Sequence, residues 1–254
     1  MTDNITSADI RGIEGMENFE ETVSASPYVK ILNSSAALEA DLPAGTIINI
    51  ANKEVLAHKG EEFKFIPIYY FRRWALWNSK TRALEKFTFS KKGPWSDGTA
   101  VEFEEMNWHN GSTPPRAQES LEFIVLPVSE LSKPEEDQRY CILSIAFTNS
   151  KIVKVAKRLE QLIYETCINE KVSKMYACSF SIKSTKEQND SGIWFSYNDP
   201  KFVEKVAEDT LAITSKVYTE VKGINNMQAT MIEPQLADNA KAAVPADVTK
   251  NTDF

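Results

Sequence analysis

The chain lacks the features that mark disulfide-rich and membrane-spanning proteins. Only 3 of its 254 residues are cysteine (Cys141, Cys167 and Cys178), and none of them forms a C-x-x-C pair. An odd, scattered set of cysteines argues against a disulfide framework and favours a reducing compartment. No run of about 18 apolar residues occurs, so no segment is expected to span a bilayer. We therefore expect a globular cytoplasmic protein without a membrane partner.

Common catalytic motifs are also absent. The sequence has no G-x-x-x-x-G-K-[ST], no G-x-G-x-x-G and no H-E-x-x-H, and its histidines and cysteines lack zinc-ligand spacing. One short pattern remains: Asp41 with Glu62 and Lys64 has the D…E-x-K arrangement of Mg²⁺-dependent nucleases, in which two carboxylates hold the metal. Such a pattern arises easily by chance, and Glu62 and Lys64 also suit the polar edge of a strand. We expect no enzymatic activity and no cofactor, and keep the nuclease as an alternative.

The charge is distributed unevenly along the chain. The total of 29 Lys and Arg against 36 Asp and Glu gives a net charge of −7, which alone disfavours a nucleic-acid partner. Residues 64–92, however, carry eight basic side chains against Glu85 alone. Because salt screens charges beyond ~10 Å, the local field decides where an anion binds. The basic residues are Lys64, Arg72, Arg73, Lys80, Arg82, Lys86, Lys91 and Lys92.

Composition divides the chain into one packed domain, 27–223, between a flexible lead-in, 1–26, and a disordered tail, 224–254. Apolar alternation predicts strands over Thr46–Ile50, Phe63–Trp77, Leu84–Phe89, Leu121–Val128, Tyr140–Phe147, Tyr176–Ser184 and Ile193–Tyr197, the last two as a hairpin. Helical spacing predicts helices over Asn149–Glu170 and Asp199–Val221, with Asp199 as the cap of the second. Strands interrupted by one mid-chain helix predict a mainly β (α+β) fold, an OB-type Greek-key barrel with the second helix packed outside.

The predicted strand Phe63–Trp77 is unusually aromatic. Side chains alternate between the two faces of a strand, so Ile66, Ile68, Tyr70 and Leu76 can fill a core. The opposite face then presents Phe65, Tyr69, Phe71, Arg73 and Trp77. Aromatic rings interleaved with cations suit a single-stranded nucleic-acid groove, where bases stack on rings and cations follow phosphates. Two alternatives stay open: a strand buried on both faces, or a bulge near Pro67 that exchanges the two sets.

The predicted helix over Asn149–Glu170 carries a second basic group. Lys151, Lys154 and Arg158 lie near its N-terminus, opposite much of the apolar stripe. The helix dipole disfavours cations at that end. A solvated lysine-rich face gives the same pattern, whereas the rim of an anion-binding surface would explain the unfavourable position.

Several pieces of the sequence, taken in order, resemble the phage single-stranded DNA-binding proteins that are built on one OB-fold. They are Pro27–Leu32, Phe65–Arg73 leading to Trp77, Trp108-x-x-Gly111 ahead of Pro114, Ile145–Arg158, and Phe180–Phe195. The resemblance covers residues 27–220. It implies cooperative, sequence-independent binding of single-stranded DNA in replication, recombination or repair, without catalysis, in the cytoplasm of the host cell.

The resemblance also implies a partner-binding tail, because such proteins end in an acidic segment capped by an aromatic residue. This chain ends in Asp253-Phe254, although Lys241 and Lys250 dilute the acidic residues. Such a tail would recruit replication or recombination enzymes.

The expected DNA contacts combine both groups. The aromatic contacts are Phe65, Tyr69, Phe71, Trp77, Trp194 and Phe195, and the basic contacts are Arg72, Arg73, Arg82, Lys86, Lys91, Lys92, Lys151, Lys154 and Arg158. A virion or assembly protein and a binder of duplex DNA or RNA stay open beside the nuclease. The sequence leaves the oligomeric state undecided.

Overall fold

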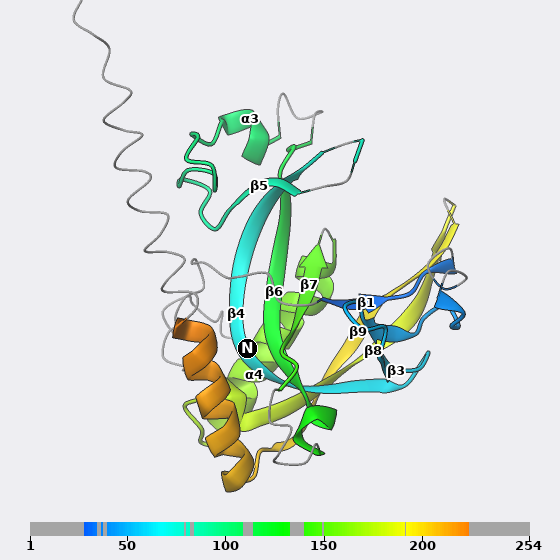
Figure 1. The fold of residues 1–254 in the computed structure, drawn as a ribbon, viewed down its shortest axis with the longest axis vertical. Helices are drawn as coiled ribbons and strands as arrows, with labels where there is room; N and C mark the ends of the chain where they lie inside the picture. Colours follow the sequence, from blue (N-terminus) through cyan, green and yellow to red (C-terminus); the bar gives the residue numbers. More distant parts are fainter. Residues whose placement is uncertain are drawn as a thin grey trace, which may run out of the picture.

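The computed structural model describes residues 28–223, apart from 35–36, 38–39, 79, 82–83, 109–113, 133–139, 149 and 191 (Figure 1). The expected flexible lead-in and disordered tail lie outside these residues. Within the described part of the chain, no helix combines the length and the apolar character needed to cross a membrane.

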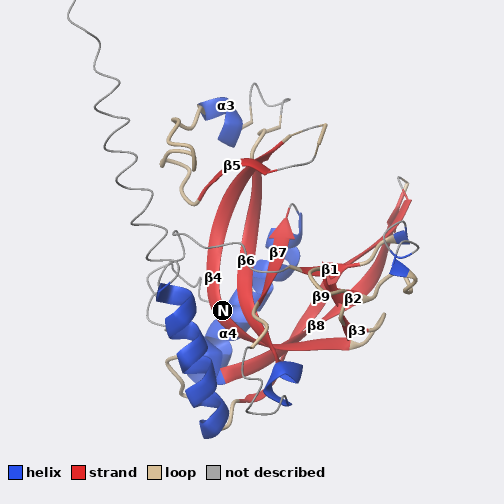
Figure 2. Cartoon of the chain, viewed as in Figure 1, coloured by secondary structure: helices blue, strands red, loops and turns tan. Residues whose placement is uncertain are grey.

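Antiparallel strands form two sheets (Figures 1 and 2). The smaller sheet has the order β1 (Val29–Ile31), β2 (Ile47–Asn49), β3 (Val55–Ala57). The larger has the order β7 (Leu143–Thr148), β6 (Gln118–Pro127), β4 (Glu62–Trp77), β8 (Cys178–Asn189), β9 (Gly192–Lys205). A further strand, β5 (Leu84–Thr88), pairs with the far end of β4. The described fold is therefore mainly β (α+β), as expected, and its two sheets do not close into one continuous barrel.

The mid-chain helix begins with an unusual turn. The π-helical segment η3 (Ile152–Ala156) runs directly into α4 (Lys157–Asn169), where the helix turns its apolar side chains toward the larger sheet. The shorter helical elements are α3 (Phe103–Met106), η1 (Val128–Ser132) and η4 (Met175–Ala177). The helix predicted over 149–170 is thus confirmed in its described part.

The last described helix spans 208–223, so its predicted start at Asp199 is wrong. Residues 199–205 belong to β9 instead, because their backbone pairs with β8. The ring of Phe202 packs edge-on against Phe180, with centroids 6.0 Å apart. Asp199 caps no helix; its φ of 55° accompanies an irregularity of the β8–β9 pairing.

Strand β4 is buried on both faces along most of its length. A β-bulge lies between Pro67 and Tyr69, so the side chains exchange faces at that point. Phe65, before the bulge, and Tyr70, after it, both enter the core beneath α4. Ile66, Tyr69 and Phe71 enter a second core beneath helix 208–223. The bulge and the doubly buried strand, both stated above as alternatives, are confirmed.

Two parts of the fold project beyond these cores. At one end, β5 and the connection to β6 pack on the far end of β4 around a separate cluster that includes Trp74, Leu76 and Trp95. We call residues 74–117 the lobe; Figure 1 shows it at the top of the view, away from α4 and from helix 208–223. The outer part of the β8–β9 hairpin, residues 183–198, projects at the upper right of the same view, and we call it the arm.

Candidate nucleic-acid interface

Three of the aromatic residues expected on an exposed face are core residues. Phe65, Tyr69 and Phe71 are 0%, 1% and 1% exposed. The expectation failed because helix 208–223 covers the face that alternation assigned to solvent, and because the bulge divides the set between two cores. A ring that is fully covered cannot stack on a base, so these three residues do not belong to a surface site.

Phe195 is also a core residue, which corrects its predicted role in stacking. Its ring lies against Gly45, where an added Cβ would be 2.8 Å from the ring carbons. Its backbone N–H donates to Asn33 Oδ1 at 2.7 Å, and Lys59 Nζ lies 5.3 Å from the ring centroid. Phe195 therefore anchors the connection between β1 and β2 to β9.

Arg73 is buried in a polar network between strands, so its predicted contact with phosphate is wrong. Its Nη2 lies 2.5 Å from Glu122 Oε1 and 3.4 Å from the hydroxyl of Tyr28. Ser120 and Ser144 donate to the two oxygens of Glu122 at 2.7 and 3.2 Å. Burial lowers the pKa of Arg73, but Glu122 and Tyr28 raise it by more, which keeps the guanidinium charged.

Two cations of the lobe and Arg72, in the adjoining part of β4, lie over indole rings. Lys91 Nζ and Arg72 Cζ are 5.8 and 6.0 Å from the ring centroid of Trp74, and Lys86 Nζ is 5.2 Å from that of Trp95. Such cation–π contacts hold an ammonium or guanidinium group at a defined position. Two of these cations also have carboxylate neighbours: Arg72 Nε lies 3.3 Å from Glu119, and Lys86 Nζ lies 3.9 Å from Glu105.

The lobe also presents exposed aromatic side chains. Trp77 ends β4 opposite Leu84 and is 43% exposed, so its predicted exposure is confirmed. Phe103, in α3, and Trp108 are 67% and 60% exposed. Sequence reasoning did not select these two as contacts. The signal of Phe103 was weak because the single turn of α3 is too short to show an apolar period. Trp108 follows this helix and belongs to no periodic element.

The turn that joins β7 to α4 and the first residues of α4 carry the basic ridge, by which we mean Lys151, Lys154, Lys157 and Arg158. The N–H of Lys157 donates to the carbonyl of Ile152 in the wide π-helical turn, a feature often found at functional sites. Lys154, Lys157 and Arg158 are exposed. Among the described residues, no carboxylate lies within 4.0 Å of the basic groups of Lys91, Lys92, Lys154 or Arg158. These four cations are thus available to an external anion.

Two carboxylates lie between the ridge and its neighbours, one toward β4 and one toward the arm. Glu160, in α4, accepts a hydrogen bond from Tyr70 of β4 and feels the charges of both Arg72 and Lys157. Glu187, in the arm, forms an ion pair with Lys151. Arg72, whose guanidinium lies over Trp74 together with Lys91, and Lys157 of the ridge thus lie on either side of Glu160, and Lys151 lies beside the arm. We call this row, from Lys91 to the arm, the path. Trp194, directly opposite Glu187 in the hairpin, is half-buried at the arm end of this path.

Some predicted contacts fall outside the described residues. These are Arg82 and the tail residues Asp253 and Phe254.

Glu62 of the nuclease pattern forms ion pairs with neighbouring lysines. Glu62 Oε1 lies 3.4 Å from Lys183 Nζ and 3.7 Å from Lys201 Nζ, across β4, β8 and β9. Asp41 lies in the connection between β1 and β2. In the described part of the chain, no three His, Cys, Asp or Glu side chains gather in a way that could hold a metal ion.

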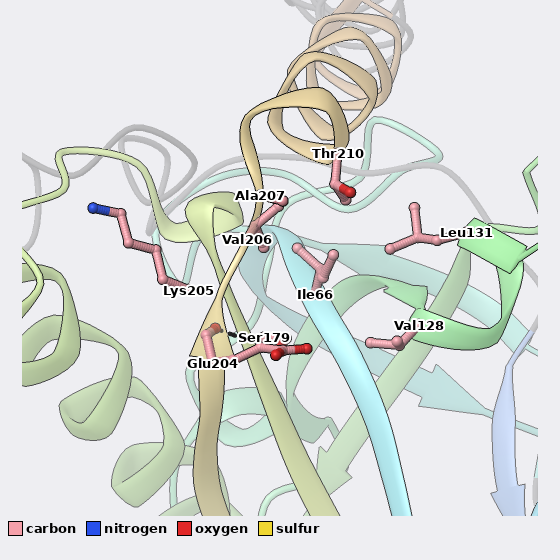
Figure 3. Close-up of a pocket in the computed structure, with 9 residues that line it drawn as sticks. All are labelled: Ile66, Val128, Leu131, Ser179, Glu204, Lys205, Val206, Ala207 and Thr210. Carbon is pink, nitrogen blue, oxygen red and sulfur yellow. Dashed lines mark hydrogen bonds between the residues drawn. The ribbon is translucent and has the colours of Figure 1, made fainter.

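A small cavity lies between the larger sheet, η1 and the beginning of helix 208–223 (Figure 3). Its volume is about 160 Å³, and aliphatic groups such as Ile66, Val128 and Leu131 form one wall. Ser179 Oγ already donates to the carbonyl of Glu204, and the ammonium group of Lys205 points away from the cavity. Because five of the nine lining residues are aliphatic and Ser179 is already hydrogen-bonded to the Glu204 carbonyl, we assign the cavity to imperfect packing beside the helix.

Comparison with known proteins places the chain in a family. No curated protein and no solved structure matches it. A family model described as "Pam3 phage gp34-like protein" matches residues 1–226, a description that supports the expected phage origin. Since this match covers most of the 254 residues, the chain belongs to the Pam3 phage gp34-like protein family.

Proposed function

We propose that the protein binds single-stranded DNA, without catalysis and without base specificity, on the face formed by the lobe, the basic ridge and the arm. The observation that carries the proposal is that four exposed cations have no described carboxylate partner, while Trp77 and Trp108 of the lobe are exposed and Trp194 of the arm is half-buried. The four cations are Lys91, Lys92, Lys154 and Arg158. A cation that is already paired must lose its partner to bind phosphate. These four need not.

Stacking would supply the second part of the binding energy. Base–aromatic stacking contributes ~1–3 kcal/mol per base and tolerates any base, because every base has a π-face. Trp77 and Trp108 of the lobe have the exposed area that stacking needs, and Trp194 lies at the other end of the path. In the proposed set of contacts, these three tryptophans replace the aromatic residues that the structure shows to be buried, Phe65, Tyr69, Phe71 and Phe195.

We also propose that the two sheets derive from an OB-type barrel. Two contacts of β1 support this proposal, because they reach both edges of the larger sheet. Tyr28, just before β1, forms a β-bridge with Ser144 of β7, and the hydroxyl of Tyr197, in β9, donates to the carbonyl of Val29 at 2.9 Å. A closed barrel needs a strand at this position. The helix α4 lies between β7 and β8 in the chain, where the sequence predicted the mid-chain helix of such a barrel.

The proposed role is protection and organisation of DNA intermediates during phage replication, recombination or repair in the host cytoplasm. Membership of a phage protein family supports this setting. Recruitment of replication or recombination enzymes through Asp253 and Phe254 belongs to the same proposal and is tested by deleting these two residues.

The test is titration with oligo-dT, followed by tryptophan fluorescence at several salt concentrations, with duplex DNA as the control. We expect quenching and weaker binding as salt increases, with a log–log slope of about −0.7 for each phosphate neutralised. Lys91→Gln/Lys92→Gln and Lys154→Gln/Arg158→Gln should each reduce the slope by about 1.4. Lys53→Gln/Lys216→Gln, which changes two exposed lysines outside the path, should leave it unchanged.

Four results would contradict the proposal. Absence of binding at low salt would exclude nucleic acid, and large homo-oligomers without affinity would favour an assembly protein. Degradation of the strand in Mg²⁺ but not in chelator would favour the nuclease. Equal or tighter binding of duplex DNA or RNA would change the class of ligand.

A further inference from the structure

Three hydrogen-bond donors converge on the carboxylate of Glu187. The ammonium group of Lys151 forms an ion pair with Oε1, and Ser196 Oγ donates to the same oxygen at 2.7 Å. Trp194 lies opposite Glu187 in the hairpin, and its indole also lowers the pKa of Glu187. Strand pairing brings this about, because Glu187 lies opposite Trp194 and Thr185 lies opposite Ser196.

The chemistry of the three donors is that of an anion site. Ammonium, hydroxyl and indole N–H groups all donate, and the indole and ammonium groups have no acceptor to offer. The site is partly shielded from water, since the side chains of Lys151 and Glu187 are 17% and 27% exposed. The hydrogen bond from Lys151 lowers the pKa of Glu187 most, which keeps the carboxylate charged.

Lys151 differs from the rest of the basic ridge in having a partner. Lys154 and Arg158 follow it within two helical turns and have no described carboxylate within 4.0 Å. A strand of DNA lying along the ridge would therefore reach free cations next to one that is already neutralised.

We propose that Lys151, Trp194 and Ser196 form a binding site for one phosphodiester group, and that Glu187 occupies this site in the free protein as an internal substitute for phosphate. Binding of a strand would displace the carboxylate and transfer its three donors to the phosphate oxygens. The source of the phosphate, a DNA strand, rests on the proposed function. The anion site itself does not, and it can be tested without DNA.

The first experiment empties the site and refills it with inorganic phosphate. Glu187→Ala leaves the partly buried Lys151 without its counter-charge, so the Tm should fall. Phosphate added at constant ionic strength should restore several degrees of Tm, because a ligand that binds only the folded state raises stability. Chloride at the same ionic strength should not, and Glu187→Ala/Lys151→Met should not respond to phosphate.

Glu62→Ala is the matched control. Glu62 also forms ion pairs with two lysines, Lys183 and Lys201, at the side of the same hairpin. An equal response of Glu62→Ala to phosphate would show a general effect on lysine-rich surfaces and would overturn the proposal.

The second experiment uses a variant that keeps the local hydrogen bonds. Glu187→Gln retains an amide oxygen for Ser196 and Trp194 but no longer competes for Lys151 as a charge. It should bind oligo-dT several-fold more tightly than the wild type. This gain in affinity should disappear in the Lys151→Met background. It should also exceed the gain in affinity that Glu62→Gln shows at the same salt concentration.

The outcomes separate this proposal from the proposed function. Rescue by phosphate without any affinity for oligo-dT would support the anion site and refute DNA binding. Affinity for oligo-dT without rescue, and with Glu187→Gln equal to Glu62→Gln, would support DNA binding and overturn the anion site. Rescue by phosphate with no effect of Glu187→Gln on oligo-dT would overturn the assignment to a strand in favour of free phosphate.

Discussion

The hydroxyl of Tyr70 lies 3.2 Å from Glu160 Oε2, and this hydrogen bond joins β4 to α4 inside the protein. Both side chains are buried. Burial raises the pKa of Glu160, and the opposing effects of Tyr70, Arg72 and Lys157 are smaller. The contact between α4 and the sheet therefore includes a carboxyl group, Glu160, whose protonated form is favoured by burial in the folded state.

We expect Glu160→Gln to stabilise the protein at neutral and alkaline pH. A carboxyl whose pKa is raised on folding contributes stability below its unfolded pKa and loses it as the pH rises through the folded value. Glutamine keeps an oxygen for Tyr70 and carries no charge. Thermal melts at pH 8 should show a Tm a few degrees above that of the wild type, and melts at pH 4 should show little difference. A larger gain at pH 4 would contradict this assignment.

Removal of one partner of the Arg73–Glu122 pair should destabilise the fold strongly. Glu122→Ala leaves a buried guanidinium group without its carboxylate, and breaking a buried pair in this way costs ~3–5 kcal/mol. Arg73→Met/Glu122→Leu, which removes both charges, should cost much less. Urea denaturation of the single and double variants measures the difference. Arg72→Ala is the control: its pair with Glu119 is partly exposed, and such pairs contribute ~0–1 kcal/mol.

Substitution of Phe71 should reduce stability, whereas substitution of Trp77 should reduce DNA binding, although the sequence predicted a DNA contact for both. Phe71→Ala removes a fully buried ring and should reduce the free energy of unfolding by ~3–5 kcal/mol. Trp77→Ala should leave the midpoint of unfolding nearly unchanged and weaken binding of oligo-dT by ~1–3 kcal/mol. Unchanged affinity in a folded Trp77→Ala protein would remove Trp77 from the interface.

Gly45 should resist substitution more than Gly60 does. Both have positive φ, 95° and 82°, but an added Cβ at Gly45 would lie 2.8 Å from the ring of Phe195, whereas at Gly60 it would meet nothing within 4 Å. Gly60→Ala should therefore show only the backbone cost, about 1 kcal/mol or somewhat more. Gly45→Ala should exceed it, because Phe195 must move as well. Equal melting temperatures of the two variants would show that the ring of Phe195 can move aside without loss of stability.

The sequence predicted the positions of most strands and of the mid-chain helix well, but it predicted poorly which of their faces are buried. The strand expected over Phe63–Trp77 begins one residue earlier, at Glu62, and the mid-chain helix is present because strong apolar periods mark both. Strand β8 continues to Asn189 through polar residues that no alternation distinguishes from a loop. There the backbone ladder with β9, rather than burial, forms the strand.

The prediction of DNA contacts from the sequence failed for a different reason. Period-2 alternation cannot distinguish a strand with one covered face from a strand with two, and the cover on Tyr69 and Phe71 comes from helix 208–223, far along the chain. Nor could charge alone show that Arg73 has Glu122 as its partner. Trp77, Lys91, Lys92, Lys154 and Arg158 lie on the surface as expected, because the sequence ends or interrupts the apolar pattern at those positions.

The lobe has its own hydrophobic cluster and is tied to the rest of the fold mainly through β4 and β6. A unit of this kind can open while the strands beneath it stay paired. Hydrogen exchange should therefore find two populations of slow amides. Those of β5 and around Trp95 would exchange through local opening of the lobe, and those of β4 near Tyr70 would exchange only on global unfolding. A ligand held by the lobe would slow both populations, because local opening and global unfolding both release it, whereas a ligand held elsewhere on the fold would slow only the second. The comparison gives a measure of binding that does not depend on fluorescence.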